Sequence, residues 1–573
     1  MKKIIILLIV AIATITTSIA QQLKLAGVFG NNMVLQQNSN VELWGWNEPS
    51  GTIEIAADWG GSVTTITDNN GRWRAKLSTP LAISGDNTGH TISFKGKNNT
   101  VTLTDVLIGD VWICSGQSNM GYSMGATSNT RGVVDAEAEI LLADYPQIRL
   151  FQVPLNPQSI EVELMPNAPS WSKCTPVRVK YYSAVAYYFA RKVQQETGIP
   201  IGIITTAFGS SRCESWTKKE VLLADPILKE KYYDPYIQNP TGYNPIQTSP
   251  TLLYNGMVAP IKKFTIKGLI WYQGEGNSGQ PDVYPRLWTA MINNFRSEWG
   301  QGNFPVYFVQ LPKYSSGSGW PAFRNAQSSL LTVPNTGMAV SIDLDDIDPN
   351  DIHPMVKKPI AERLAFWALA KDYGKNIVFC GPVLDQIEFS GNKAVVKFQQ
   401  STIGTGIKTY DNNNVREFEI AEANKVYYQA VAVIVGNSIE LTSNQVLQPQ
   451  YVRYAHSPTP NPNLINHAGF PAVPFNTETW NYNVKISADL NSSIDLETYK
   501  ILKYIKKNDG IEINFGNMNE ITNIQLINTC GSLLFTLKTN SITACNFVPI
   551  SKRGVYILHV VAGKKSFSHK ILF

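Results

Sequence analysis

The sequence predicts an α/β protein in which a mainly parallel sheet, with helices on both faces, is flanked by β-sandwich-type domains. Between residues 106 and 376, short apolar runs typical of buried strands alternate with longer segments that have apolar residues at helical spacing. Before and after this block, short strand-type runs are separated by turns rich in Asn and Gly. A chain of 573 residues is also too long for one ordinary domain.

The first twenty residues are expected to be a secretory signal peptide. Lys2 and Lys3 precede an apolar run, and Ser18-Ile19-Ala20 offers a small-x-small cleavage site. This run is too short for a convincing membrane span, and no later segment approaches eighteen apolar residues. We therefore expect a protein without a membrane span that is secreted, or is periplasmic or on the cell surface after cleavage.

The β-rich regions lie on both sides of the central block. Residues 21–105 are expected to form a small antiparallel β domain, because runs such as VELWGW and TIEIAA are separated by tight-turn sequences. Residues 377–485 return to this texture in KAVVKFQ, VREFEIA and AVAVIV. Residues 486–498 are expected to be a polar linker, and residues 499–573 a further small β module.

The central block, 106–376, is expected to alternate strands and helices. After the first strand, strands are predicted at 199–208, 264–273, 303–311 and 336–343, and helices at 178–197, 283–300 and 355–374. The first of these helices is followed by Gly198 and Pro200, which are typical of a helix end. Alternating strands and helices imply a mainly parallel sheet.

The first strand of this block ends abruptly in the turn Ser115-Gly116-Gln117-Ser118-Asn119. Ligands of open α/β sheets bind just beyond the carboxyl ends of strands. Ser118 is therefore placed as a nucleophile would be, with the alternative that it only caps the next helix. The turns at 208–211, 273–277 and 350–354 also follow predicted strands, so four polar turns are expected at one sheet edge.

A serine nucleophile needs a base, most often histidine. His353 is the only one of the six histidines between residues 106 and 376, and it lies in the carboxylate-rich segment DLDDIDPNDIHP. Cys114 is an alternative nucleophile, although its place inside an apolar run favours a buried thiol.

Charge and cysteine content limit which ligands and cross-links the chain is expected to have. The net charge of +5 is small for this length and gives no case for nucleic acid binding. Of the six cysteines, Cys530 and Cys545 are the expected disulfide pair in an exported chain. Without a CxxC pair or a His/Cys cluster, no zinc site and no cofactor are expected.

Several motifs resemble those of the sialate O-acetylesterase family, which are SGNH-type carbohydrate esterases. They are GDVWICSGQSNM, AFGSSRCESW, LLYNGMVAP, WYQGEGN, PAFRNAQ and DPNDIHP, followed by FEIA, VRYA and NHAGFPAVPF, and the resemblance runs from about Leu25 to residue 480. The last module contains GVYILHV and has a basic, apolar end. In these features it resembles the sorting domain of type IX secretion cargo, which implies the secretion machinery as a partner.

The family resemblance implies a flavodoxin-like SGNH-hydrolase sheet and a serine esterase that removes acetyl groups from O-acetylated sialic acids. Ser118 would attack the acetyl carbonyl, and His353 would act as general base and then acid. The oxyanion hole would consist of the N–H groups of Ser118 and Gly209 and the side chain of Asn277, with Gln273 as the alternative.

The sequence departs from the family pattern at two places. The family's orienting Asp stands three residues before the histidine, where this chain has Asn350. Asp351 and Glu275 are therefore rival candidates for the acid, and a Ser–His pair held by backbone carbonyls is the third. Ser210 stands where the family commonly has a second glycine.

Substrate recognition leaves more alternatives open. Trp216 and Tyr272 could stack against a sugar ring and Arg324 could pair with a sialate carboxylate, or all three could be structural. A neutral acetylated plant polysaccharide (xylan or pectin) is an alternative substrate, and a non-catalytic carbohydrate-binding protein an alternative function. A generic α/β-hydrolase fits less well, because Met120 stands where its G-x-S-x-G turn requires glycine.

Overall fold

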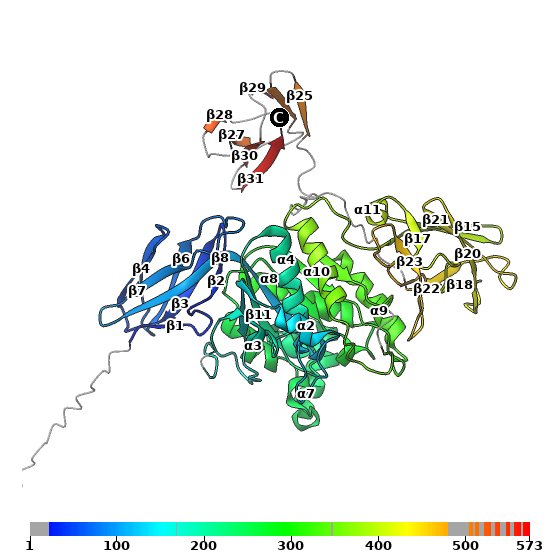
Figure 1. Cartoon of the computed structure of the whole chain (residues 1–573), viewed down its shortest axis with the longest axis horizontal. Coiled ribbons are helices and arrows are strands. Elements are labelled where there is room, and N and C mark those ends of the chain that lie inside the picture. Colours follow the sequence, from blue (N-terminus) through cyan, green and yellow to red (C-terminus); the bar gives the residue numbers. More distant parts are fainter. Residues whose placement is uncertain are drawn as a thin grey trace, which may run out of the picture. The chain divides into compact units, whose positions relative to one another are not determined.

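The computed structural model describes residues 22–167, 169–344 and 348–479, and seven strands between Lys503 and Leu572. The chain forms two compact units, Met1–Leu490 and Asn491–Phe573 (Figure 1). The predicted signal peptide and linker, Cys530 and Cys545 all lie outside the described residues. Within the described part of the chain, no helix has the length and apolar character needed to cross a membrane.

The first unit is built around a twisted sheet whose main path runs β10-β9-β11-β8-β12-β13-β14. All neighbours on this path are parallel except the edge pair β10–β9. The strands are β8 (Thr100–Gly116), β9 (Tyr145–Gln152), β10 (Ser172–Cys174), β11 (Ile201–Ala207), β12 (Gly268–Tyr272), β13 (Val306–Val309) and β14 (Thr336–Ala339). The predicted α/β class with a mainly parallel sheet is confirmed.

The strand order fixes where a ligand site belongs. With β8 counted as the first strand, the parallel strands β9, β11, β8, β12, β13 and β14 have the order 2-3-1-4-5-6. The chain therefore turns to opposite sides of β8 when it forms β11 and β12, which makes the carboxyl end of β8 a topological switch point. Ser118 lies two residues beyond that end.

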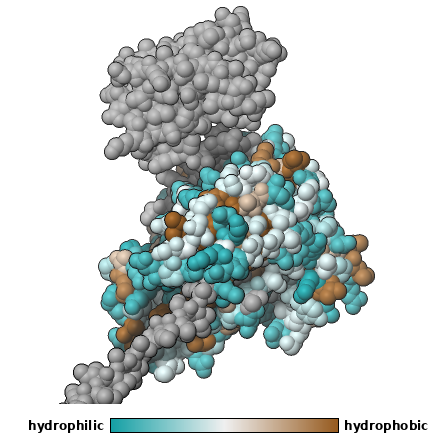
Figure 2. Space-filling view, turned by 90° about the vertical axis from the view of Figure 1, so that its left-hand side faces the viewer, coloured by the Kyte–Doolittle hydropathy of each residue, from teal (hydrophilic) through white to brown (hydrophobic). Residues whose placement is uncertain are grey.

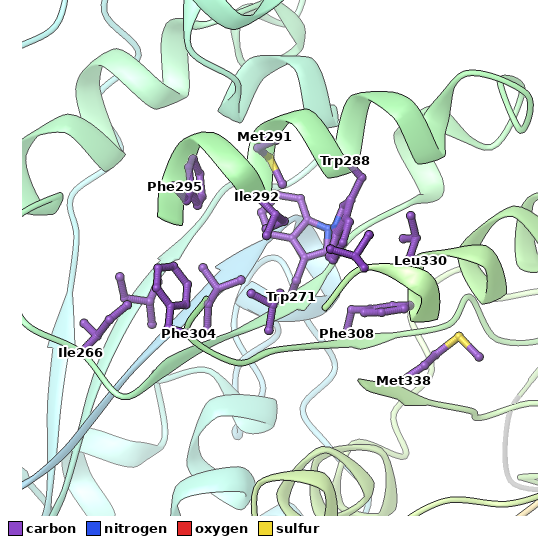
Figure 3. Close-up of a cluster of buried hydrophobic side chains, with 14 of the residues drawn as sticks. Ile266, Trp271, Trp288, Met291, Ile292, Phe295, Phe304, Phe308, Leu330 and Met338 are labelled. Atoms are coloured by element: carbon purple, nitrogen blue, oxygen red, sulfur yellow. The ribbon is translucent and has the colours of Figure 1, made fainter. Parts of the chain in front are cut away.

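Helices cover both faces of the sheet because its side chains alternate. On β12, Leu269 and Trp271 belong to the apolar cluster that includes α8 (Tyr284–Trp299), whereas Ile270 belongs to the cluster with α4 (Ala184–Thr197) and α10 (Lys358–Lys371). Figure 3 shows the first cluster, in which Trp271 and Phe308 of the sheet lie beside Trp288 and Met291 of α8. The sheet is thus buried on both sides.

The remaining α-helices of the described residues have ten residues or fewer. They are α1 (Ser118–Gly121), α2 (Ala136–Leu141), α3 (Pro176–Val179), α5 (Lys219–Ala224), α6 (Pro226–Leu228), α7 (Asp234–Gln238), α9 (Trp320–Ser329) and α11 (Gln400–Ile403). The helix predicted at 178–197 is divided between α3 and α4, because Ser183 Oγ accepts a hydrogen bond from the N–H of Ala186 and so caps a new helix. Gly198, at φ +69°, ends it as predicted.

Strand β8 also belongs to the N-terminal β region (Figure 1). Its residues 100–106 pair with β7 (His90–Lys95), its residues 107–109 with β2 (Val34–Gln36), and its residues 110–116 with β11. The expected boundary between residues 105 and 106 therefore falls inside one continuous strand.

Figure 2 shows that apolar residues on this side of the molecule form separate patches among hydrophilic ones.

The N-terminal region contains two groups of strands, consistent with the predicted sandwich. One sheet is β1-β3-β6, and β5, β4 and β7 continue from β8. The bounds are β1 (Lys24–Leu25), β3 (Asn40–Trp46), β4 (Thr52–Ala57), β5 (Ser62–Ile66) and β6 (Arg72–Ser78). Strand β6 was not among the predicted ones, although its residues alternate between exposed polar and buried apolar positions, as a half-buried strand requires.

The second β region, after α10, contains three antiparallel sheets: β15-β16-β21-β20, β17-β23 and β19-β18-β22-β24. The bounds are β15 (Leu384–Ser390), β16 (Lys393–Phe398), β17 (Ile407–Thr409), β18 (Phe418–Ala421), β19 (Tyr427–Gln429), β20 (Val431–Val435), β21 (Ser438–Thr442), β22 (Tyr451–Tyr454), β23 (Leu464–Asn466) and β24 (Phe475–Asn476).

The described strands of the second unit form two antiparallel sheets, β25-β26-β29 and β28-β27-β30-β31. The bounds are β25 (Lys503–Lys507), β26 (Gly510–Asn514), β27 (Ile521–Asn528), β28 (Leu533–Lys538), β29 (Asn546–Pro549), β30 (Val555–Ala562) and β31 (Lys565–Leu572).

Candidate active site

The turn after β8 needs glycine and places a serine at the switch point. At Gly116, with φ +143°, an added Cβ would lie 2.1 Å from the carbonyl oxygen of Tyr272, so only glycine fits between β8 and β12. The next residue, Gln117, donates its backbone N–H to the same carbonyl. Helix α1 then begins at Ser118, which is half-buried.

A histidine 235 positions away in the chain meets this serine. His353 Nε2 lies 2.8 Å from Ser118 Oγ, a hydrogen-bond distance. The histidine stands in the loop between β14 and α10, and its side chain is 38% exposed. The pair therefore lies where a substrate can reach it.

Four turns meet around this pair. The side-chain oxygen Oε1 of Gln117 accepts hydrogen bonds from the N–H groups of Gly274 and Gly276, in the turn after β12. Gly209, in the turn after β11, faces Ser118, since a Cβ on this glycine would lie 3.7 Å from Ser118 Cβ. With the histidine loop, the turns expected at one sheet edge are together.

Asp351 is the carboxylate beside the imidazole. Its Oδ1 accepts the backbone N–H of His353 at 2.8 Å and lies 3.8 Å from the ring nitrogen Nδ1. Arg131 pairs with its other oxygen. Asn350, at the family's usual position for the acid, binds Ser315 Oγ instead. Asp351 thus holds the loop turn and lies within ion-pair range of the ring.

The rival acid, Glu275, does not bond to the imidazole. Its Oε1 accepts a hydrogen bond from Asn119 Nδ2 at 2.5 Å, and burial raises the pKa of this carboxyl. Asn119 Nδ2 also donates to the carbonyl of Ile352, next to His353. Glu275 therefore contacts the histidine loop only through Asn119.

The pKa of His353 is lowered from its ordinary value. Partial burial is the main cause, and the positive charges of Lys357 and Arg131 add to it, whereas Asp351 opposes them. A lowered pKa keeps the imidazole neutral, and so able to accept a proton, further into the acidic range.

Two backbone N–H groups are available to a substrate oxygen. Neither the N–H of Ser118 nor that of Gly209 donates a hydrogen bond to any described residue. Both belong to turns that meet at Ser118, which makes them the candidates for an oxyanion hole.

The two side chains expected to complete the oxyanion hole are occupied elsewhere. Asn277 Nδ2 donates to Glu214, and its Oδ1 accepts from the N–H of Cys213 and from Gln273 Nε2. Gln273 Oε1 in turn accepts the hydroxyl of Tyr284. Asn277 is 1% exposed and Gln273 is fully buried, so both brace the turns from inside. Their expected part in the oxyanion hole stays a prediction.

The three candidate substrate-binding side chains are also buried. Trp216 and Tyr272 have no exposed surface, and Trp216 Nε1 donates to Ser211 Oγ. Arg324 is equally buried, pairs with the carbonyl of Ser457, and has a pKa lowered by burial to about 9. The structural alternative holds for all three, because none offers a face to a sugar.

Cys114 is likewise a core residue. It is fully buried, and burial raises the pKa of its thiol well above the usual range. A thiol of this kind is unreactive, which leaves Ser118 as the nucleophile candidate.

Sequence reasoning missed two groups of residues. Arg131 and Arg212 are cations of the loops around Ser118 and His353, and neither follows from a local pattern. Asn119 and Lys357 link the nucleophile turn to the histidine loop, since Lys357 Nζ donates to Asn119 Oδ1 at 2.5 Å. The available signal was the position of Asn119 directly after Ser118.

The comparisons with known proteins agree with this geometry. A family profile described as "Carbohydrate esterase, sialic acid-specific acetylesterase" matches residues 108–365. A sialate O-acetylesterase from Mus musculus is 30% identical over 448 residues, which cover 68% of this chain and 81% of that protein. The sialate O-acetylesterase from Homo sapiens is 31% identical, with coverages of 65% and 76%.

A solved structure is similar over most of the chain. The crystal structure of a carbohydrate acetylesterase from Xanthomonas citri has 32% sequence identity and a TM-score of 0.71, and the match covers 80% of this chain and 100% of that one. The protein is therefore an ester hydrolase and not a non-catalytic carbohydrate-binding protein. On these relationships the chain belongs to the sialate O-acetylesterase family of carbohydrate esterases.

Proposed function

We propose that this protein is a secreted O-acetylesterase that removes acetyl groups from O-acetylated sialic acids through a serine acyl-enzyme. The observation that carries the proposal is the 2.8 Å contact between Ser118 Oγ and His353 Nε2 at the switch point of the sheet. The family supplies the substrate class, since its curated members from Mus musculus and Homo sapiens are sialate O-acetylesterases.

The geometry supports acyl transfer in two steps. His353 Nε2 takes the hydroxyl proton of Ser118 as Oγ adds to the acetyl carbonyl carbon, and the N–H groups of Ser118 and Gly209 hold the negative oxygen. The imidazolium then gives its proton to the sugar oxygen, which leaves as an alcohol. Water, activated by the same imidazole, attacks the acetyl group, and acetate departs from Ser118.

Two arginines support an anionic sugar as substrate. Arg131, whose side chain is 60% exposed, lies beside Asp351 next to the histidine. On the other side, Arg212 is half-buried against Gly276, and its guanidinium makes no ion pair with a described residue. Guanidinium groups suit carboxylate recognition, and sialic acids carry a carboxylate that neutral xylan lacks.

The proposal also includes an SGNH-type fold and export by type IX secretion. The order 2-3-1-4-5-6 of the parallel strands, with the serine after the first strand and the histidine after the last, supports an SGNH-type fold. The signal-peptide pattern at residues 1–20 and the C-terminal β module support export by type IX secretion. N-terminal sequencing of protein recovered outside the cell tests cleavage near Gln21.

The test of the nucleophile is Ser118→Ala. We expect loss of essentially all acetate release, on the order of 10⁶ in kcat, because the serine carries the covalent step. A serine-directed phosphonate should label the wild-type protein at Ser118. Ser210→Ala, at an exposed serine in the neighbouring turn, is the matched control and should keep activity within about twofold. Unchanged turnover by folded Ser118→Ala would contradict the proposal.

The substrate test compares acetate release from O-acetylated sialic acid, acetylated xylan and acetylated pectin. We expect kcat/KM to be highest for the sialic acid. Arg212→Ala should raise KM for that substrate about tenfold and leave neutral p-nitrophenyl acetate unaffected, as loss of one charge-assisted contact predicts. A preference for xylan, unaffected by Arg212→Ala, would favour the plant polysaccharide alternative.

A further inference from the structure

A buried lysine, Lys357, bonds to the residue that follows Ser118 in the chain. Lys357, four residues after His353, is 1% exposed, and its ammonium donates to Asn119 Oδ1 at 2.5 Å. Its other neighbours are the faces of Tyr122 and Tyr272, whose centroids lie 4.7 and 5.5 Å from Nζ. No carboxylate of a described residue forms an ion pair with it. Burial lowers the pKa of this amino group to about 7, so the charged form is costly to keep here even with Glu275 and Asp351 nearby.

Asn119 connects this lysine to both halves of the site. It follows Ser118 directly, and its Nδ2 donates to Glu275 Oε1 at 2.5 Å and to the carbonyl of Ile352 at 3.0 Å. Ile352 is the residue before His353. One buried side-chain amide thus bonds to the ammonium of Lys357, to a buried carboxylate, and to the main chain of the histidine loop.

The lysine, which donates, and the carboxyl of Glu275, which accepts, determine which way this amide points. With Oδ1 toward Lys357 and Nδ2 toward Glu275, both contacts are attractive. A rotation of 180° about the Cβ–Cγ bond would set the NH₂ group against the ammonium and the oxygen against the carboxylate, so that both would be repulsive. Only the first orientation lets Nδ2 also bind the carbonyl of Ile352.

We propose that Lys357 and Glu275 are positioning residues that fix the amide of Asn119, through which the His353 loop is held in register with Ser118. This inference rests on the proposed roles of Ser118 and His353. It assigns Glu275 a task other than orienting the imidazole, and it gives Lys357 a role in the reaction without contact with the substrate.

The first experiment replaces Lys357 by methionine, which has a side chain of similar length and no charge. Lys357→Met should lower kcat for p-nitrophenyl acetate about 10²-fold and change KM by less than about threefold, because a misplaced base affects the transition state rather than binding. Phosphonate labelling of Ser118 should slow in proportion. Lys358→Met is the matched control, since Lys358 is exposed and pairs with Glu139 at the surface. It should keep kcat within about twofold.

The second experiment asks whether the effect passes through Asn119. The measurement is made at about pH 8, where the imidazole is neutral with or without the charge of Lys357. In an Asn119→Ala background, Lys357→Met should then change kcat by less than about twofold, because the amide to be oriented is gone. Independent, multiplicative losses would overturn the proposal, and so would a Lys357→Met protein with wild-type kcat.

A further variant covers the case in which Lys357→Met does not fold. Glu275→Gln keeps the shape of the side chain and removes its charge, so kcat should fall about tenfold, with no added effect in the Asn119→Ala background. Wild-type kcat for Glu275→Gln, or a loss that persists without Asn119, would overturn the proposal. These outcomes differ from failure of the proposed function, in which folded Ser118→Ala would remain active.

Discussion

Single residues around His353 set the conditions under which it can act as a base. The ring is half-buried, faces positive charge from Lys357 and Arg131, and has one carboxylate, Asp351, beside it. Burial and positive charge favour the neutral ring, and the carboxylate favours the charged one. The balance lies on the side of the neutral base.

The pH dependence follows from this balance. Because the base must be neutral and its pKa is lowered, kcat/KM should fall on acidification with a midpoint below 6.5. Arg131→Ala removes a positive charge and leaves Asp351 unpaired, so the midpoint should move to higher pH. Hydrolysis of p-nitrophenyl acetate between about pH 4.5 and 8 measures both. A flat profile, or a midpoint above 6.5 in the wild type, would contradict the assignment of His353.

Asp351 is the residue to change in order to test the orienting acid. Asp351→Asn retains an oxygen that can accept the backbone N–H of His353, and so keeps the turn while it removes the charge. If Asp351 stabilises the imidazolium, kcat should fall by about 10²–10⁴-fold, as for comparable removals in serine hydrolases. Steady-state kinetics with a check of folding by circular dichroism decide this. A loss below tenfold would leave the ring held by its backbone neighbours.

The sequence could predict some of these residues and not others. His353 followed by elimination, because the central block holds no second histidine. Trp216 and Tyr272 could not be told from core residues, because an aromatic side chain next to a strand end looks the same in either role. Asn119 was missed because its role depends on Lys357 and Glu275, which come from distant segments.

Whole elements were more predictable than their ends. The helix predicted at 283–300 is α8, Tyr284–Trp299, and the strand predicted at 264–273 is β12, Gly268–Tyr272. Periodicity shows which faces of an element are buried: α8 buries one face and β12 buries both. It does not report a cap such as Ser183 or a strand such as β8 that runs through two sheets.

The turn after β11 contains a residue in an unfavourable backbone conformation, and its effect on thermal stability can be measured. Ser210, the position where the family commonly has glycine, has φ +61° and is exposed. An L-residue in this region costs about 1–2 kcal/mol, part of which a glycine recovers despite its greater freedom in the unfolded chain. Ser210→Gly should therefore raise Tm by about 1–2 °C. Ser329→Gly, at φ −65° in a helical turn, is the control and should lower Tm. A lower Tm for Ser210→Gly would show that its hydroxyl contributes more than the strain costs.

On the scale of the whole molecule, the N-terminal region is part of the core that supports the site. Strand β2 pairs with β8, and Val34 within it is fully buried. Gln36 donates from Nε2 to Asp110 at 2.6 Å, and its Oε1 accepts the N–H of Val111. Trp171, between β9 and β11 in the chain, donates to the carbonyl of Val28 at 2.7 Å. The region therefore completes the hydrogen bonding of the strand that carries Ser118.

Two truncations should consequently behave in opposite ways. Deletion of residues 22–105 would expose the apolar edge of β8 to water and leave the buried Asp110 without Gln36, so we expect no cooperative thermal unfolding and no esterase activity. Ending the chain at Leu490 removes only the second compact unit, and kcat/KM should stay within about twofold because every residue assigned to the site lies in the first. Calorimetry and p-nitrophenyl acetate hydrolysis on both proteins make the comparison. An active protein without residues 22–105 would mean that β8 needs no partner on that side, and an inactive one ending at Leu490 would mean that the second unit is required for the site.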